Sequence, residues 1–106
     1  MKYLMIAKLK EKPATMSREE YLKSAVKEWE TALELRRNKN VETVYAFAPL
    51  GGGVAIGNAN SEDELKALMT RLPFYNYLDI NFSPIISVED AIAKAKRNLE
   101  AFKAEK

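Results

Sequence analysis

The chain contains no cysteine and no histidine among its 106 residues. The missing cysteine excludes disulfides, thiol nucleophiles and thiolate metal sites. The missing histidine excludes histidine-ligated zinc or haem and any Ser-His-Asp triad. Any proton transfer must therefore use aspartate, glutamate, tyrosine or lysine side chains. We expect neither a metal nor a cofactor.

The chain also lacks an excess of one charge and a long apolar run. Seventeen basic and fifteen acidic residues give a net charge of +2. This near balance does not predict the basic surface that binding of nucleic acid requires. No apolar stretch is long enough to cross a membrane, and no cleavable signal precedes the first strand-like run. With the absence of cysteine, these features predict a cytoplasmic protein that binds neither nucleic acid nor membrane.

Length and hydrophobic periodicity predict one domain that covers residues 1–106. Strand-like and helix-like segments follow in the order β-α-β-β-α-β, with an extra helix at about 88–103. This order is typical of the ferredoxin-like α+β fold, in which both helices cover one face of an antiparallel sheet. The expected elements before the last helix are strands at 3–9, 41–48, 54–58 and up to about 86, and helices at 17–37 and 61–72.

Two apolar surfaces of this arrangement have no cover within one chain. The first strand is apolar at both parities, with Met5 on one side and Leu4 and Ile6 on the other. Because the helices cover only one face of the sheet, we expect a second subunit to pack sheet on sheet against the other face. The last helix also carries an apolar stripe that needs a partner, formed by Val88, Ile92, Ala95, Leu99 and Phe102. The chain is therefore predicted to form a homo-oligomer.

The segment from Leu72 to Ile80 joins a helix to the last strand. Its proline cannot continue a helix, so the helix should end near residue 71 or 72, and the strand should follow. Three aromatic residues then form a wall that either lines a ligand site or closes a core. Asp79 lies on the polar side of the strand, facing either water or a wet cavity. The triglycine at 51–53 precedes a strand rather than a helix, which predicts a hairpin turn with positive φ angles rather than a phosphate loop.

Glu28 and Glu30 flank Trp29, the only tryptophan of the chain. On most helices such acids face solvent. Alternatively, a carboxylate that leans into an apolar pocket has its pKa raised by desolvation and can exchange protons near neutrality. Trp29 is expected at a pocket edge, because tryptophan is seldom wholly buried and its N–H seeks a partner.

The segment from Leu72 to Ile80 resembles the muconolactone isomerase family. The family has Leu-Pro, two bulky apolar residues, Pro, Tyr, Met, Asp and an aliphatic residue there, against Leu-Pro-Phe-Tyr-Asn-Tyr-Leu-Asp-Ile in this chain. The likeness continues in the element order and length up to about Ile86. It implies a dimeric α+β barrel, with some members assembling into decamers, and a pocket completed by a neighbouring subunit.

The resemblance also implies an activity, the cofactor-free isomerisation of a small unsaturated lactone. This chemistry needs a base beside a carbonyl and a donor that steadies the resulting enolate. Carried onto this sequence, the resemblance assigns Glu28 as the base and Tyr45 as the donor, with Tyr75 or Tyr77 as alternatives. The residues implied to bind the substrate are Trp29, Phe74, Tyr75, Tyr77 and Asp79.

The second strand departs from the family, which carries a Trp-Arg pair and then a glycine. Tyr45, Ala46 and Pro49 occupy these positions here. Since the arginine is what would clamp a carboxylate, the expected ligand is a small apolar or weakly polar molecule. Two alternatives fit the same fold: a non-catalytic ligand-binding or structural oligomer, and a cofactor-free monooxygenase.

Overall fold

The computed structural model describes residues 1–11 and 13–105. A serine side chain caps the N-terminus of each of its three α-helices. Ser17, Ser61 and Ser87 each accept a hydrogen bond from the backbone N–H three residues on. These caps satisfy amides that have no partner inside the helix. The elements are β1 (Lys2–Leu9), α1 (Arg18–Arg37), β2 (Val41–Ala46), β3 (Gly52–Asn58), α2 (Glu62–Met69), the 3₁₀ turn η1 (Tyr75–Tyr77), β4 (Leu78–Ile85) and α3 (Val88–Ala104).

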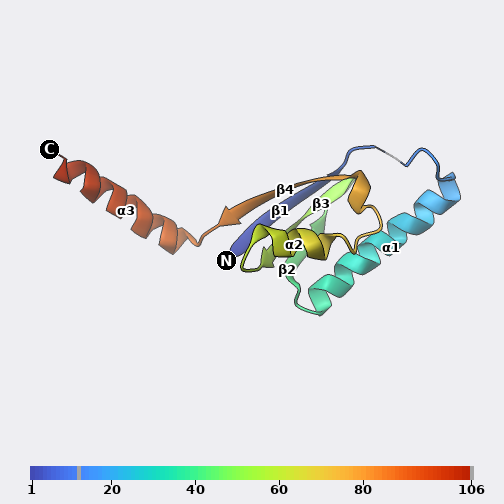
Figure 1. Ribbon diagram of the computed structural model, residues 1–106, viewed down its shortest axis with the longest axis horizontal. Coiled ribbons are helices and arrows are strands. Elements are labelled where there is room, and N and C mark those ends of the chain that lie inside the picture. The colour runs from blue at the N-terminus through green and yellow to red at the C-terminus, as the bar shows by residue number, and fades with distance from the viewer. Residues whose placement is uncertain (12, 106) are drawn as a thin grey trace.

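The four strands form one antiparallel sheet in the order β2-β3-β1-β4 (Figure 1). The first strand of the chain is central, and it pairs with β3 on one side and β4 on the other. This is the strand order of two interleaved βαβ units, so the predicted ferredoxin-like α+β fold is confirmed. The additional C-terminal helix is present as well.

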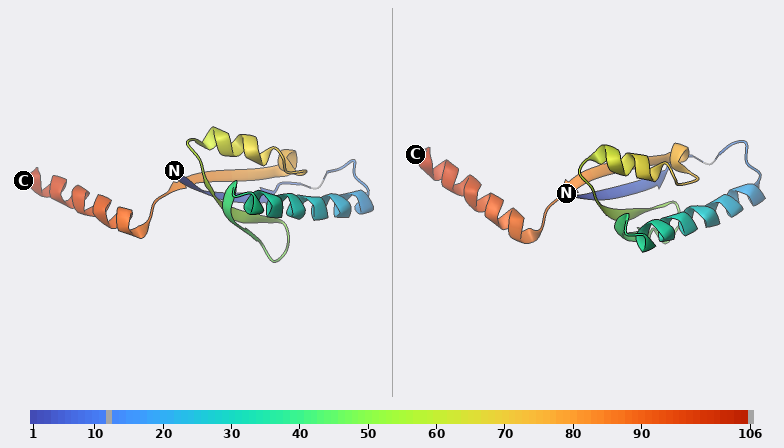
Figure 2. Two further views of the ribbon diagram at one scale, coloured as in Figure 1. Left: turned by 90° about the horizontal axis from the view of Figure 1, so that it is seen from below. Right: turned by 60° about the horizontal axis from the view of Figure 1, so that its bottom comes forward.

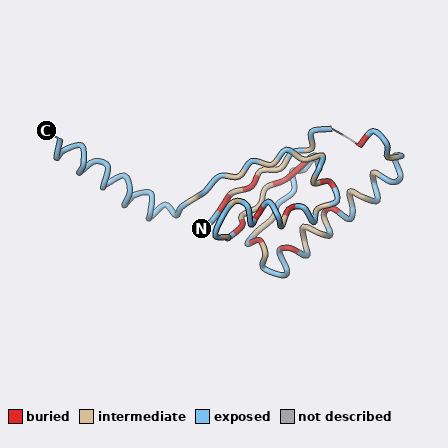
Figure 3. The backbone as a smooth tube through the Cα atoms, in the orientation of Figure 1, coloured by how far each residue is buried: buried red, intermediate tan, exposed pale blue. Residues whose placement is uncertain are grey.

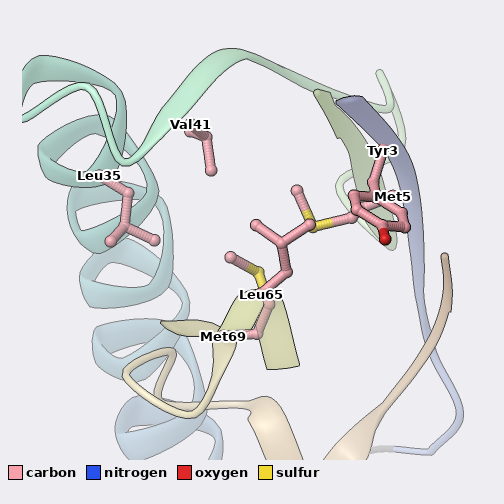
Figure 4. Packing of buried hydrophobic residues seen from close by; sticks show 6 residues of the cluster. All are labelled: Tyr3, Met5, Leu35, Val41, Leu65 and Met69. Carbon is pink, nitrogen blue, oxygen red and sulfur yellow. The ribbon is translucent and has the colours of Figure 1, made fainter. Parts of the chain in front are cut away.

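The core lies between one face of the sheet and the helices α1 and α2. Side chains from β1, α1, β2 and α2 converge there (Figure 4), namely Tyr3, Met5, Leu35, Val41, Leu65 and Met69. The odd-numbered residues of β1 face this core, because successive side chains of a strand point to opposite faces. Leu65 and Val41 are the largest side chains that are fully buried. Most buried positions lie in the sheet and on the helix sides that face it, and Pro13 and Phe74 of the connecting segments are buried as well (Figure 3).

Gly57 lets the short helix α2 approach the sheet closely. A Cβ atom at this position would lie 2.7 Å from Leu65 Cδ2 and 2.9 Å from Met5 Cε. We expect Gly57→Ala to lower the free energy of unfolding by about 1–3 kcal/mol, because the added methyl group overpacks the core. The measurement is urea denaturation, and Gly51→Ala is the control, since nothing lies within 4 Å of a Cβ there. Equal midpoints for both variants would contradict the expectation.

The β2–β3 hairpin is confirmed, but its turn differs from the predicted one. Of the three consecutive glycines only Gly52 has positive φ, and β3 already begins there. A Cβ at Gly52 would collide with the carbonyl oxygen of Ala7, so close strand pairing requires glycine at this point. The left-handed residue of the turn itself is Leu50, at φ 65°. The turn therefore places an exposed leucine where a glycine was expected.

The segment from Leu72 to Ile80 also differs in detail from the prediction. Helix α2 ends at Met69, two or three residues earlier than expected. The aromatic residues do not open the strand, because Tyr75–Tyr77 form a 3₁₀ turn. Its bonds run from the amide of Tyr75 to the carbonyl of Leu72, at 3.0 Å, and from the amide of Tyr77 to the carbonyl of Phe74, at 2.8 Å. The last strand consequently begins only at Leu78.

The other face of the sheet and helix α3 both stay uncovered within one chain. Leu4 and Ile6 of β1 pair with Ile56 and Val54 of β3, and all four are half-buried on the side away from the core. Helix α3 leads away from the end of β4 and from the rest of the chain in both views of Figure 2. None of its residues is buried, and the chain spans 66 × 27 × 25 Å as a result.

Candidate functional site

A cavity of about 630 Å³ lies between α1, the sheet and the segment that follows α2. Its walls are mostly apolar and come from β1, α1, β2, β3, β4 and the β2–β3 turn. The described residues that line it include two charged side chains, Glu28 and Arg18, and two further donors, Tyr21 and Trp29. A concave, mostly apolar space with a few polar groups is the usual form of a small-molecule site.

Glu28 is the one polar or charged residue among the described positions that is buried, with 8% of its surface exposed. It lies in the middle of α1, and its Oε1 accepts a hydrogen bond of 2.9 Å from the backbone N–H of Phe74. This bond joins α1 to the segment after α2, two parts of the chain that are 46 residues apart. Of the two positions considered from the sequence, Glu28 therefore occupies the one in an apolar pocket rather than the one facing solvent.

The environment of Glu28 favours the protonated acid. Burial raises the pKa of the Glu28 carboxyl above its ordinary value of 4.5, while the Phe74 amide opposes this by stabilising the carboxylate. Desolvation is the larger effect, because transfer of a charged group from water into an apolar cavity is costly. A carboxyl with a raised pKa can accept and return a proton closer to neutral pH.

The raised pKa predicts how stability depends on pH. Below pH 4.5, Glu28 is protonated in both the folded and the unfolded chain. Above pH 4.5, Glu28 of the unfolded chain loses its proton before Glu28 of the folded chain does. The free energy of unfolding therefore falls as pH rises through the folded pKa. Glu28→Gln stays neutral and can keep the bond to Phe74. We expect the unfolding free energy of the unmodified chain, minus that of Glu28→Gln, to be constant below pH 4.5 and to decline above it. Urea titrations across this pH range measure the difference, and a difference that grows with pH would contradict the assignment.

Tyr21 is a cavity residue that was missed from the sequence. Its ring stacks on that of Phe74, with centroids 5.4 Å apart and an interplanar angle of 18°. Tyr21 precedes Glu28 by seven residues, which is close to two full helical turns, so the two side chains share a side of α1. This spacing was visible in the sequence and could have identified the pair.

The other predicted site residues do not lie together. Trp29 and Phe74 line the cavity together with Glu28. Tyr75 and Asp79 instead border a second, smaller depression beside β4, and Tyr77 lines neither space. Tyr45 lies apart from Glu28: it is 68% exposed and pairs with Val54 on the face of the sheet away from the helices. The single chain therefore does not bring Tyr45, Tyr75, Tyr77 or Asp79 to the Glu28 cavity.

Arg18 is the cation that the sequence interpretation did not find. It is the first residue of α1 and the only basic side chain among the described residues that line the cavity. It lies ten residues before Glu28, about 15 Å along the helix axis. The resemblance implied an arginine at the position of Ala46 in β2, whereas Arg18 comes from α1.

Within residues 1–11 and 13–105, no group of three or more Asp or Glu side chains is placed to hold a metal ion. In the same part of the chain, no helix is both long and apolar enough to cross a membrane.

Solved structures of other proteins share this fold. A crystal structure of muconolactone isomerase aligns with a TM-score of 0.67 at 20% identity, over 82% of this chain and 90% of that one. The 5-chloro-2-hydroxyhydroquinone dehydrochlorinase of Burkholderia phenoliruptrix AC1100, in complex with 2,5-dihydroxybenzoquinone, aligns with a TM-score of 0.56 at 15% identity. That match covers 85% of this chain and 98% of the dehydrochlorinase. Likeness at these identities concerns the fold alone.

Family membership rests on sequence. No curated protein sequence matches the chain. A family model, that of muconolactone delta-isomerase, matches residues 1–91 and so covers everything from β1 to the first turn of α3. The chain is therefore a member of the muconolactone delta-isomerase family.

Proposed function

We propose that the protein is a cofactor-free isomerase that moves a proton between two carbons of a small unsaturated carbonyl compound. The observation that carries the proposal is Glu28, a carboxyl buried in an apolar cavity with its pKa raised. The Glu28 carboxylate takes a proton from the carbon beside the carbonyl, and the C–H electron pair moves into an enolate. The protonated Glu28 then returns the proton to another carbon of the conjugated system, so the product is an isomer.

Donors in the same wall support the enolate. Tyr21 and Trp29 line the cavity from the helix that carries Glu28, and their side chains contain an O–H and an N–H that we propose as donors. A donor aimed at the carbonyl oxygen stabilises negative charge best where water is excluded. The Phe74 amide already occupies Glu28 Oε1, so Oε2 is the oxygen that takes the proton.

Turnover of muconolactone in D₂O tests the proposal. We expect NMR to show isomerisation, with deuterium in the product to the extent that protonated Glu28 exchanges its proton with solvent before it returns a proton to carbon. Binding without isomerisation would overturn the proposal. That outcome would favour the second candidate, a ligand-binding protein without catalysis. The separation of Tyr45 from Glu28 also favours this candidate.

Arg18 is proposed to hold an anionic group of the ligand at the end of the cavity away from Glu28. We expect Arg18→Gln to weaken binding of muconolactone about tenfold, since a charge-assisted hydrogen bond to a carboxylate is lost. The methyl ester of the same lactone should bind the unmodified chain and Arg18→Gln with equal affinity. Arg36→Gln is the matched control, an arginine of the same helix that does not line the cavity. Calorimetric titration measures both ligands, and an equal loss for the ester would exclude the clamp.

We also propose that two copies pack their sheets together. The half-buried residues Leu4, Ile6, Val54 and Ile56 form a continuous apolar strip on the face away from the helices. Burial of such a strip stabilises association by about 25 cal/mol per Å². Light scattering of the purified protein gives the mass in solution, and a mass of one chain would refute this assembly.

A further inference from the structure

The two charged residues that line the cavity lie far apart on one helix. Arg18 is the first residue of α1 and is exposed, whereas Glu28 lies ten residues further on and is buried. Ten residues of α-helix rise about 15 Å. The N-terminal end of α1 reaches past the end of the sheet in Figures 1 and 2, so Arg18 lies at the open end of the cavity. A ligand held by Arg18 therefore keeps its anionic group near water and extends its other end towards Glu28.

The wall of α1 between these two residues is free of charge. Tyr21 and Ala25 lie between Arg18 and Glu28, at intervals of three, four and three residues. Such intervals place all four on one side of the helix, and all four line the cavity. Among the described residues of α1 between the two ends, no other charged side chain lines the cavity. An uncharged wall between two charged ends favours an apolar middle part of the ligand.

The sheet opposite this wall has small side chains and therefore leaves space. Ala55 of β3 pairs with Met5 of β1, whose side chain faces the helices, and Ala7 pairs with Gly53 one step along the same face. All of these residues line the cavity. Its volume of about 630 Å³ is in the range that encloses drug-sized ligands, which are larger than one small lactone ring.

We propose that the substrate carries its carboxylate on an apolar arm, about seven bonds away from the reacting lactone ring. This substrate class rests on the isomerase function proposed above. Contacts of about 3 Å at each end leave about 9 Å of the roughly 15 Å between Arg18 and Glu28 for the ligand. An extended chain advances about 1.2 Å per bond, so this distance corresponds to about seven bonds. An unsaturated lactone with a carboxyalkyl arm of medium length fits both ends at once.

Muconolactone is too short to meet Arg18 and Glu28 together. A single methylene group separates its carboxylate from its ring, so the ring stays near the open end while Arg18 holds the carboxylate. Binding of this kind contributes to affinity without bringing the ring to the base. Because kcat/KM compares the transition state with the free enzyme and free substrate, such unreactive binding does not raise it. Muconolactone is therefore isomerised only when it leaves Arg18 and moves to the Glu28 end.

A series of unsaturated lactones tests the proposal, with carboxyalkyl arms of one to about eight methylene groups. We expect kcat/KM, followed by absorbance or NMR, to be highest at about six methylene groups. Arg18→Gln should lower kcat/KM about tenfold more for that arm than for muconolactone, because only the long arm keeps the charge-assisted hydrogen bond in the transition state. A loss of the same size at every arm length would overturn the proposal, as would a loss that is largest for muconolactone.

Two controls separate charge from burial in this series. Methyl esters of the same arms lengthen the ligand without its charge, so they show how much of the gain comes from burial of methylene groups alone. Their kcat/KM should fall equally little in Arg18→Gln at every length. Arg36→Gln removes an arginine of the same helix that does not line the cavity, and it should leave the dependence on arm length unchanged.

Ala25→Leu provides a readout that needs no turnover. Ala25 lies between the two ends, so a leucine there narrows the apolar middle that the long arm crosses. We expect calorimetric titration to show a loss of affinity about tenfold greater for the lactone with about six methylene groups than for muconolactone, which stays near Arg18. Ser24→Leu is the matched control, since Ser24 is the preceding residue of α1 and does not line the cavity. Equal losses for the two ligands in Ala25→Leu would overturn the proposal.

The two experiments distinguish this substrate class from the isomerase activity itself. If no lactone is isomerised but affinity depends on Ala25 and on arm length as expected, the proposed activity fails and the ligand class stands. If lactones are isomerised at a rate that depends on neither arm length nor Arg18, the activity stands and the proposed substrate class is wrong.

Discussion

Glu28→Gln is expected to lower kcat/KM for lactone isomerisation by about 10²- to 10⁴-fold, the usual contribution of a positioned general base. Glutamine has nearly the same shape and can accept the 2.9 Å hydrogen bond from the Phe74 amide through its carbonyl oxygen. It cannot take a proton from carbon at neutral pH. The variant therefore removes the proposed proton transfer while the connection between α1 and the segment after α2 is retained. Isomerisation followed by absorbance or NMR measures the loss.

Glu30→Gln is the control for this experiment. Glu30 lies on the same helix two residues further on and is exposed, so its replacement should leave kcat/KM unchanged within a factor of two or so. A large loss in both variants would indicate a general effect of charge on α1. Full activity of Glu28→Gln would refute the role of Glu28 as base.

The pH dependence of the reaction follows from the same group. The base must be ionised to act, so kcat/KM should rise with pH as Glu28 loses its proton. Because burial raises the pKa of this carboxyl, the midpoint of the rise should lie above 4.5. Midpoints at or below that value would show that the reactive group is a solvated carboxyl elsewhere.

Local patterns in the sequence were sufficient to predict the fold. Capping serines at 17, 61 and 87 and the periodicity of apolar residues predicted where the helices begin, because these signals act within one or two turns. The pairing of β1 with β3 and β4 followed from the order of elements. The start of β4 was misplaced, since the hydrogen bonds of η1 after Pro73 satisfy the backbone locally before any strand pairing.

The site was only partly predictable, because it depends on contacts between distant segments. Nothing near Glu28 in the sequence shows that the Phe74 amide, 46 residues away, would hold its carboxyl in an apolar cavity. The position of Tyr45 likewise depends on which face of the sheet its side chain points to. Its pairing with Val54 places it on the face away from the helices. Arg18 was passed over because a basic residue at a helix start ordinarily faces water.

Phe74 links the stability of the fold to the chemistry of the site, so its replacement tests both. Its side chain is 5% exposed and stacks on Tyr21, while its backbone N–H donates to Glu28. We expect Phe74→Ala to lower the free energy of unfolding by about 3–5 kcal/mol through loss of a buried ring. A domain of this size is stable by only about 5–15 kcal/mol, so much of the margin is removed. Chemical denaturation in urea measures the loss.

Phe74→Leu separates packing from chemistry, because leucine leaves a smaller cavity than alanine and the cost in stability is correspondingly smaller. It keeps the backbone N–H that binds Glu28 but replaces the ring that stacks on Tyr21 and shields the carboxyl from water. Weaker desolvation should lower the pKa of Glu28 towards 4.5, so the midpoint of the pH–rate profile should move to lower pH. If the midpoint stays where it is while stability falls, the Phe74 ring only fills the core, and the raised pKa of Glu28 comes from the other walls of the cavity.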